Sequence, residues 1–329
     1  MMRVAGRTVN RITAVFRRAN LVASALFLVA ILIPATTGYS FDHSEPASLA
    51  AHALLLDAVA TGDKIVAVGD HGNVVVSRDN GLTWTQIIVP TRALLTAVCF
   101  PDRQHGWIVG HDGVILSTQN GGSTWERQDD GKDLETVLLD VLFLDATRGF
   151  AVGAYGKFLA TMDGGKTWVA RNISDHEVHF NQLSASPDGT LFIAGESGTL
   201  LSSVDVGKKW RQNEVPYDGS LFGSLPMENR TIIVYGLRGH ILRSTDDGAT
   251  WEPKNSEVRV LISSGLRLKS GTIVLGGQGG NFFLSRDSGA NIQPWKPADF
   301  NTSVSAMVEA SDGFLVTVGE AGAVRIKLP

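Results

Sequence analysis

The chain carries one short pattern, Gly-x-x-Gly, at seven evenly spaced places. Successive copies end 41 to 43 residues apart, at Gly72, Gly113, Gly156, Gly198, Gly239, Gly280 and Gly322. A period in the low forties is typical of propeller blades and related repeat units, each of which buries its apolar face against the next unit. The spacing therefore predicts seven similar units in one array.

A second pattern, Ser/Thr-x-Asp-x-Gly-x-Thr-Trp, follows six of these marks at a fixed distance, and we call it the box. Its acidic or amide position holds Asp79, Asn120, Asp163, Asp205, Asp246 and Asp287. Its final position in the first five copies holds Trp84, Trp125, Trp168, Trp210 and Trp251. A short polar residue followed by glycine is typical of a tight hairpin turn, and a tryptophan after it suits burial against a neighbouring sheet. We expect a structural role, because acids in six separate turns cannot share one substrate.

Each unit contains four short runs of β-branched, aliphatic and aromatic residues separated by turn residues. No helical period is evident after the N-terminal segment, and residues 41–329 amount to seven units. The pattern predicts an all-β fold, a seven-bladed β-propeller of four-stranded antiparallel blades. The last unit supplies only three strands, so we expect residues 41–51 to add the missing outer strand of the seventh blade.

The N-terminal 40 residues have the composition of a targeting segment. They contain five arginines and no acid, an apolar run at 21–33 and then small residues. This order predicts a secretory signal peptide over residues 1–40, cleaved after Ser40, or an uncleaved N-terminal anchor. The run is short for a membrane span. The protein is thus expected to be exported to the periplasm, or to the thylakoid lumen in a phototroph.

Charge and cysteine content exclude some classes of function. Without residues 1–40 the chain has 24 Lys and Arg against 33 Asp and Glu, a net charge of −9. Such a protein is poorly suited to nucleic acid, which is bound by neutralising phosphates. Cys99 is the only cysteine, so no internal disulfide is possible. Its apolar surroundings, "LLTAVCF", predict a buried, unreactive thiol.

The stretches "AVGDHGNVVVSRDNGLTW" and "AVGAYGKFLATMDGGKTW" resemble the photosystem II stability and assembly factor family, whose members carry this box, also called the BNR repeat. The resemblance covers about residues 50–326. It implies a seven-bladed propeller and a non-enzymatic assembly factor. Its partner would be a protein, a membrane protein or a subunit of a membrane complex, and no small-molecule cofactor is implied.

The Gly-x-x-Gly turns are expected on the face opposite the box turns. Their polar and aromatic tips form the candidate binding face: Asp70, His71, His111, Asp112, Tyr155, Glu196, Arg238 and Glu320. The alternative is that these are ordinary solvated turns. Equivalent turns of adjacent blades are expected to be too far apart for shared ligation by two histidines. "SDHEVHF" at 174–180 lacks the His-Glu-x-x-His order of a helical zinc site. We therefore predict no metal site.

The inner strands are expected to line the central channel with Thr96, Asp140, Gln182, Ser264 and Ser305. Asp140 is the only acid expected there, whereas a typical glycosidase needs a carboxylate pair. A sialidase-like glycosidase, which would need an arginine triad for its substrate, remains one alternative function, although the early Arg-Ile-Pro motif typical of that class is absent. A carbohydrate- or peptide-binding propeller without an assembly role is another. The sequence favours a non-enzymatic, extracytoplasmic protein-binding scaffold with no catalytic residues.

Overall fold

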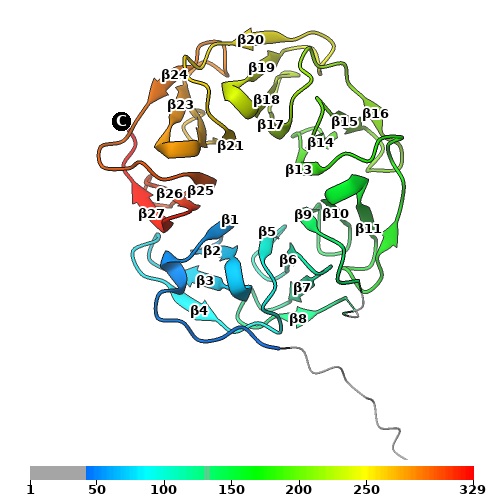
Figure 1. Cartoon of the computed structure of the whole chain (residues 1–329), viewed down its shortest axis with the longest axis vertical. Helices are drawn as coiled ribbons and strands as arrows, with labels where there is room; N and C mark the ends of the chain where they lie inside the picture. Colours follow the sequence, from blue (N-terminus) through cyan, green and yellow to red (C-terminus); the bar gives the residue numbers. More distant parts are fainter. Residues whose placement is uncertain (1–41, 130, 132) are drawn as a thin grey trace, which may run out of the picture. The chain divides into compact units, whose positions relative to one another are not determined.

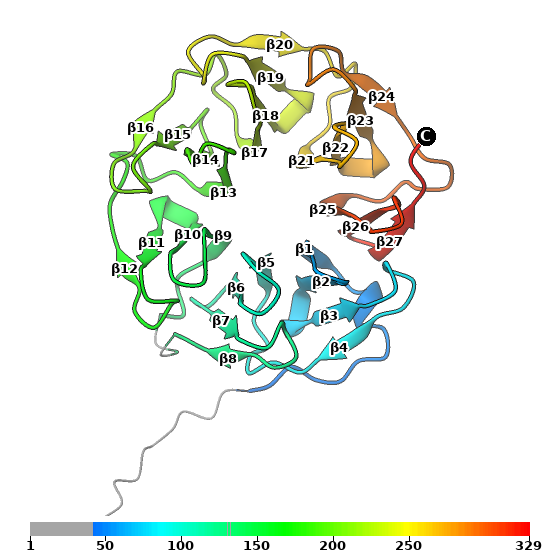
Figure 2. The ribbon, with the colours of Figure 1, turned by 180° about the vertical axis from the view of Figure 1, so that it is seen from behind.

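The computed structural model describes residues 42–129, 131 and 133–329. These residues form seven antiparallel sheets arranged in a ring around a central channel, as Figures 1 and 2 show from opposite sides. Six sheets have four strands and the seventh has three, always in chain order, with the first strand beside the channel. The predicted seven-bladed propeller is confirmed. The predicted signal peptide lies outside the described residues.

Each of the first four blades is a sheet of four consecutive strands. Blade 1 contains β1 (Leu55–Thr61), β2 (Lys64–Gly69), β3 (Val74–Ser77) and β4 (Thr85–Ile87). Blade 2 contains β5 (Leu95–Cys99), β6 (Gly106–Gly110), β7 (Ile115–Thr118) and β8 (Glu126–Arg127). Blade 3 contains β9 (Leu138–Phe143), β10 (Gly149–Gly153), β11 (Phe158–Thr161) and β12 (Val169–Ala170). Blade 4 contains β13 (Phe180–Ala185), β14 (Leu191–Gly195), β15 (Leu200–Ser203) and β16 (Arg211–Gln212).

Three further blades complete the ring. Blade 5 contains β17 (Leu221–Pro226), β18 (Ile232–Gly236), β19 (Ile241–Ser244) and β20 (Glu252–Lys254). Blade 6 contains β21 (Ile262–Arg267), β22 (Ile273–Gly277), β23 (Phe282–Ser285) and β24 (Gln293–Trp295). Blade 7 contains β25 (Val304–Glu309), β26 (Leu315–Gly319) and β27 (Gly322–Ile326). The described helices are single 3-10 turns: η1 (Ala50–His52), η2 (Asp70–Gly72), η3 (Ala154–Gly156), η4 (Leu237–Gly239) and η5 (Gln278–Gly280).

The two glycines of each Gly-x-x-Gly turn meet different requirements. A Cβ on the opening glycine would lie against the carbonyl oxygen that precedes the blade's first strand, for example 2.1 Å from that of Leu54 at Gly69. The closing glycine has a positive φ in every blade, 68° at Gly72. Only glycine meets the first requirement, and it meets the second without steric cost. The Gly-x-x-Gly pattern therefore recurs because the backbone of each turn favours glycine at both positions.

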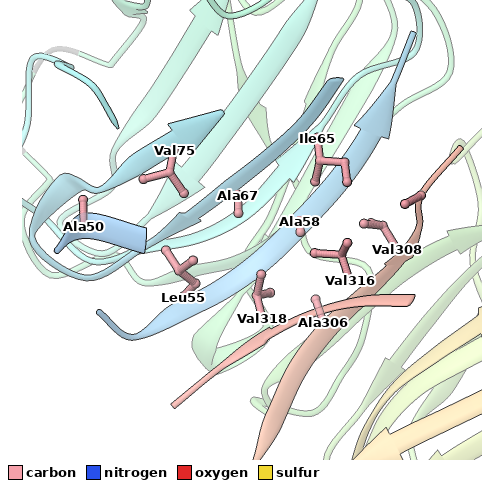
Figure 3. Close-up of a cluster of buried hydrophobic side chains, with 11 residues drawn as sticks. Ala50, Leu55, Ala58, Ile65, Ala67, Val75, Ala306, Val308, Val316 and Val318 are labelled. Atoms are coloured by element: carbon pink, nitrogen blue, oxygen red, sulfur yellow. The ribbon is translucent and has the colours of Figure 1, made fainter. Parts of the chain in front are cut away.

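Seven apolar clusters hold the ring together, one between each pair of adjacent blades. The cluster between blades 1 and 7, drawn in Figure 3, joins Leu55 and Val75 of blade 1 to Val308 and Val318 of blade 7. The remaining clusters fill the other six junctions in the same way. Because each blade is buried on both faces, its middle strands are buried at nearly every position.

The expected closure of the ring by the N-terminal segment was wrong. Blade 7 has only three strands among the described residues, and residues 43–47 lie along the outer edge of blade 1. There the Ser44 amide donates to Val89 O at 2.9 Å, and Gln86 bonds Ala47 and Glu45. The segment contains Pro46, which has no N–H to donate to a neighbouring strand, and residues 42–45 before it are polar. The junction closes instead through the apolar cluster and η1, which contacts β27.

Candidate functional site

The box turn is a self-contained hydrogen-bonded structure between the third and fourth strands. In blade 1 the Ser77 hydroxyl donates to Asp79 Oδ1 at 2.8 Å and accepts the Gly81 amide at 2.7 Å. Asp79 also accepts the Thr83 amide at 2.9 Å and the Thr83 hydroxyl at 2.6 Å. Asp163, Asp246 and Asp287 repeat this set of bonds, with Asn291 replacing threonine in the last. Both oxygens of each of these carboxylates therefore accept hydrogen bonds within the turn.

The same bonds keep the box carboxylates ionised. Hydrogen bonds from Thr83, with its hydroxyl contributing most, lower the pKa of Asp79 to about 2. The pKa values of Asp163 and Asp246 fall to about 2 for the same reason, through Thr167 and Thr250. The structural role expected for these residues therefore has a geometric basis.

The box tryptophans reach the junction between their own blade and the preceding one. Trp125 is 5% exposed and packs in the cluster between blades 1 and 2. Trp168, Trp210 and Trp251 occupy equivalent places but are half-buried. Each indole therefore links two sheets, as the sequence pattern indicated.

The opposite face, which we call the GxxG face, carries the Gly-x-x-Gly turns. In five turns the residue before the closing glycine is not glycine and yet has a φ of 53° to 57°: His71, Asp112, Tyr155, Ser197 and Arg238. Blade 6 has Gly279 at this position, and Ala321 of blade 7 has no positive φ. Non-glycine residues in this conformation are uncommon, and bulky ones are more strained. Their side chains point outward, and Tyr155 is 74% exposed.

Two of the predicted binding residues come together on this face. The Tyr155 ring meets the His179 ring edge-on, with centroids 4.9 Å apart. Glu196 accepts the His179 amide at 3.1 Å, and its carboxylate lies 3.5 Å from His179 Nδ1. His179, which sequence reasoning considered only as part of "SDHEVHF", thus joins Tyr155 to Glu196 across blades 3 and 4. One blade further on, Tyr217 stacks on His240 at 4.2 Å.

The other predicted residues stay separate. His71 pairs with its neighbour Asp70 at 2.8 Å, and the Glu320 carboxylate accepts the Ser303 amide at 3.2 Å. His111 and Asp112 lie one blade away from His71. Within the described part of the chain, no group of three or more His, Cys, Asp or Glu side chains could hold a metal ion.

The channel is polar, as expected, but it holds two carboxylates. A cavity of about 220 Å³ is lined by Thr96, Asp140, Gln182, Ser264 and Ser305, and also by Asp57. The expectation of a single acid was wrong, because each first strand has a bulge that resets which residues face the channel, and Asp57 lies directly after the bulge of β1. Asp140 has the equivalent place in β9.

Both carboxylates join neighbouring blades. Asp57 accepts the Val98 amide of blade 2 at 2.8 Å, and Asp140 accepts the Leu183 amide of blade 4 at 2.6 Å. Gln182 follows the same pattern by accepting the Ser224 amide of blade 5 at 2.7 Å. Polar residues just after the bulge position therefore link the blades around the channel.

Burial shifts the ionisation of this region strongly. It raises the pKa of Asp57 to about 7. It raises the pKa of Asp140 to about 8, with a further contribution from the Asp57 charge. Burial also raises the pKa of Cys99 to about 12, which agrees with the unreactive thiol expected there, although the side chain is only half-buried. No arginine lines the cavity in the part of the chain that is described.

Comparison with known proteins places this architecture in a family. A profile of the family described as "Photosynthesis system II assembly factor YCF48" matches residues 76–136 and 131–327. The chain belongs to this family. Because the match begins in blade 1 and ends in blade 7, family membership covers almost the whole ring.

Individual relatives align over shorter stretches. The photosystem II stability/assembly factor HCF136 of Cyanidioschyzon merolae is 37% identical over 22% of this chain and 18% of its own length. The photosystem II assembly protein Ycf48 of Thermosynechococcus vestitus is 44% identical over 13% of this chain and 12% of its own length. The chain thus matches less than a fifth of these curated relatives.

Among solved structures, one described as YCF48 bound to D1 peptide superposes with a TM-score of 0.70 at 19% identity. It covers 88% of this chain, and this chain covers 97% of it. At that identity the likeness supports the fold. No helix in residues 42–129, 131 or 133–329 combines the length and apolarity needed to cross a membrane.

Proposed function

We propose that this protein is a non-enzymatic, exported assembly factor that binds a subunit of a membrane protein complex through its GxxG face. Family membership supports an assembly role, and the solved relative described as bound to a D1 peptide supports a protein ligand. The predicted signal peptide supports export to the periplasm or the thylakoid lumen. D1 is therefore the first partner to test.

The observation that carries the choice of face is the set of exposed aromatic and charged side chains at its turn tips, of which Tyr155 is 74% exposed. Left-handed backbone costs a non-glycine residue roughly 1–2 kcal/mol. Blade 6 has glycine at this position, so the repeat itself accepts the unstrained residue. Tyr155 and Arg238 nevertheless stand at equivalent tips, exposed to solvent. Box turns hold comparably strained residues such as Val206, so the choice of the GxxG face depends on its exposed aromatic and charged tips.

The second carboxylate in the channel does not make a glycosidase activity a better explanation of the site. Asp57 and Asp140 each accept two backbone amides, one of them from the next blade. Tyr235, the tyrosine beside them, is 1% exposed. A nucleophile or a proton donor needs access to a substrate, and these groups are committed to joining the blades.

Replacing tip residues by glycine is expected to separate stability from binding. Arg238→Gly should raise the free energy of unfolding by up to about 1 kcal/mol, because the strain is relieved and no packing is lost. Tyr155→Gly should change it less, because the contact with His179 is lost. Both variants should recover several-fold less D1 from detergent-solubilised membranes than the wild type does. Urea unfolding and quantitative co-purification measure the two effects.

Val206→Gly is the matched control. Val206 has a φ of 58° in a box turn, so glycine relieves comparable strain on the opposite face. It should raise stability and leave the recovery of the partner unchanged. Equal recovery with Arg238→Gly, Tyr155→Gly and the wild type would exclude the GxxG face as the binding surface.

A further inference from the structure

A cavity on the box face interrupts the regularity of the ring. It lies between blades 4 and 5 and measures about 790 Å³. Phe192, Met227 and Ile232 form its apolar floor, and Val204, which is 84% exposed, stands at its rim. We call it the 4/5 cavity. Comparison with the other junctions that contain a box turn shows which kind of side chain is missing there.

At five of the six junctions that contain a box turn, a donor side chain from the preceding blade binds a backbone carbonyl of that turn. Gln128 donates to Gly164 O at 3.0 Å, Arg171 to Gly207 O at 2.8 Å and Arg243 to Ser288 O at 2.8 Å. Lys64 and Arg325 bind the equivalent carbonyls of Gly121 and Asn80. Four of these five donors are cationic. The propeller therefore uses a basic side chain, lying along the groove, to cap a turn with exposed carbonyls.

The junction between blades 4 and 5 lacks this cap. Among the described residues, no blade 4 side chain donates to a carbonyl of the 245–249 turn, and the contact there comes from blade 5 itself, where Arg230 donates to Asp246 O at 3.4 Å. Ser202 stands where blade 5 has Arg243. Asn213 stands where blade 3 has Arg171, and it bonds Leu200 O of its own blade instead. The groove that holds a long donor side chain at the five junctions above is open here, and it forms the 4/5 cavity.

The charges around the cavity favour a cation in that place. Four acids line it, Asp188, Glu228, Asp246 and Asp247, against two lining arginines, and Glu228 is paired with Arg267 from outside the cavity at 2.5 Å. Arg230 is held by Asp247 at 2.5 Å, and Arg211 donates to the neutral Asn213 amide at 3.0 Å. An incoming arginine would lay its aliphatic stem on the apolar floor and point its guanidinium at Asp188 and at the Asp247 carbonyl, the counterpart of Gly164 O and Ser288 O.

We propose that the 4/5 cavity binds an arginine side chain of a protein partner, in the place that the propeller's own side chains take at the five other junctions. The site lies on the face opposite the Gly-x-x-Gly turns and does not depend on the proposed binding role of that face. The partner therefore presents an exposed arginine, with an apolar neighbour to contact Val204.

The probe is N-acetyl-argininamide, followed by NMR shifts of the backbone amides of Thr231, Asp247 and Gly248. We expect saturable shifts at these amides with a dissociation constant in roughly the millimolar range, as suits so small a ligand. N-acetyl-citrullinamide has nearly the same shape without the charge and should bind at least tenfold more weakly. Equal shifts from both compounds, or arginine shifts at every box turn alike, would overturn the proposal.

Variants of the cavity test the same idea from the protein side. Ser202→Arg gives blade 4 the residue of blade 5 and should fill the groove internally, abolishing the arginine shifts and raising the melting temperature. Gln119→Arg adds the same charge to another exposed box position, where blades 1 and 6 already have Arg78 and Arg286, and should leave binding unchanged. Asp188→Asn keeps the acceptor for Thr190 and should weaken binding several-fold even if Ser202→Arg folds poorly. Unchanged binding in both Ser202→Arg and Asp188→Asn would refute the site.

Discussion

Trp125→Ala is expected to lower the free energy of unfolding by about 3–5 kcal/mol, the usual loss for truncating a large buried aromatic residue. The indole is 5% exposed and meets the Phe100 ring edge-on at 5.8 Å. It fills the junction between blades 1 and 2, so the substitution leaves a cavity that two rigid sheets cannot close. Urea unfolding of the purified protein measures the loss.

Three comparisons show whether burial is the cause. Trp168→Ala should cost less, about 2–3 kcal/mol, because this indole is half-buried. Leu82→Ala, in a box turn but 68% exposed, should change stability by under about 0.5 kcal/mol. Trp125→Phe should recover most of the loss, because Trp125 Nε1 has no hydrogen-bond partner among the described residues. A loss as large for Leu82→Ala as for Trp125→Ala would contradict this account.

Stability is expected to fall by several kcal/mol as the pH rises from about 4 to 8. The folded protein holds protons on Asp57 and Asp140, whose pKa values are raised to about 7 and about 8, whereas the unfolded chain releases them near 4. The folded state therefore binds more protons across this interval, and its stability decreases with pH. For Asp57 alone, a shift of about three pKa units corresponds to at most about 4 kcal/mol.

The box carboxylates act in the opposite sense at lower pH. Because hydrogen bonds lower the pKa of Asp79 and Asp287 to about 2, their stabilising contribution is complete above pH 4 and is lost as the pH falls through 2. The two effects together place maximal stability near pH 4–5. Urea midpoints measured from pH 3 to 9 should decline above pH 5 in the wild type and less in Asp57→Asn. A wild-type midpoint that rises from pH 5 to 8 would refute raised channel pKa values.

The fold was predictable because each turn of the repeat places specific demands on a few residues. The opening glycine of each turn touches backbone, and the closing glycine has a positive φ, so both recur at a fixed spacing. The box recurs because Ser77 and Asp79 bond each other and the turn between them. Ring closure was not predictable in this way, since it depends on contacts between the two ends of the chain, which no local spacing encodes.

The candidate sites were predictable only in part. Alternation along the inner strands identified Asp140 and Gln182 but missed Asp57, which has the equivalent place after the bulge of β1. The role of His179 depends on two turns from different blades, so its spacing within "SDHEVHF" was uninformative. The 4/5 cavity could have been suspected from sequence, because Asn213 stands where the two preceding blades have the long donors Gln128 and Arg171.

The junction of blades 7 and 1 should form slowly during folding, because its contacts join residues that are far apart in the chain. Elsewhere a blade docks on a neighbour about 40 residues away, as Asp57 does on Val98 at a separation of 41. At the seam, Ser311 must find Asn80 at a separation of 231. Loop-closure entropy makes such contacts slow to form. We therefore expect the contacts between blades 7 and 1 to form after those at the other six junctions.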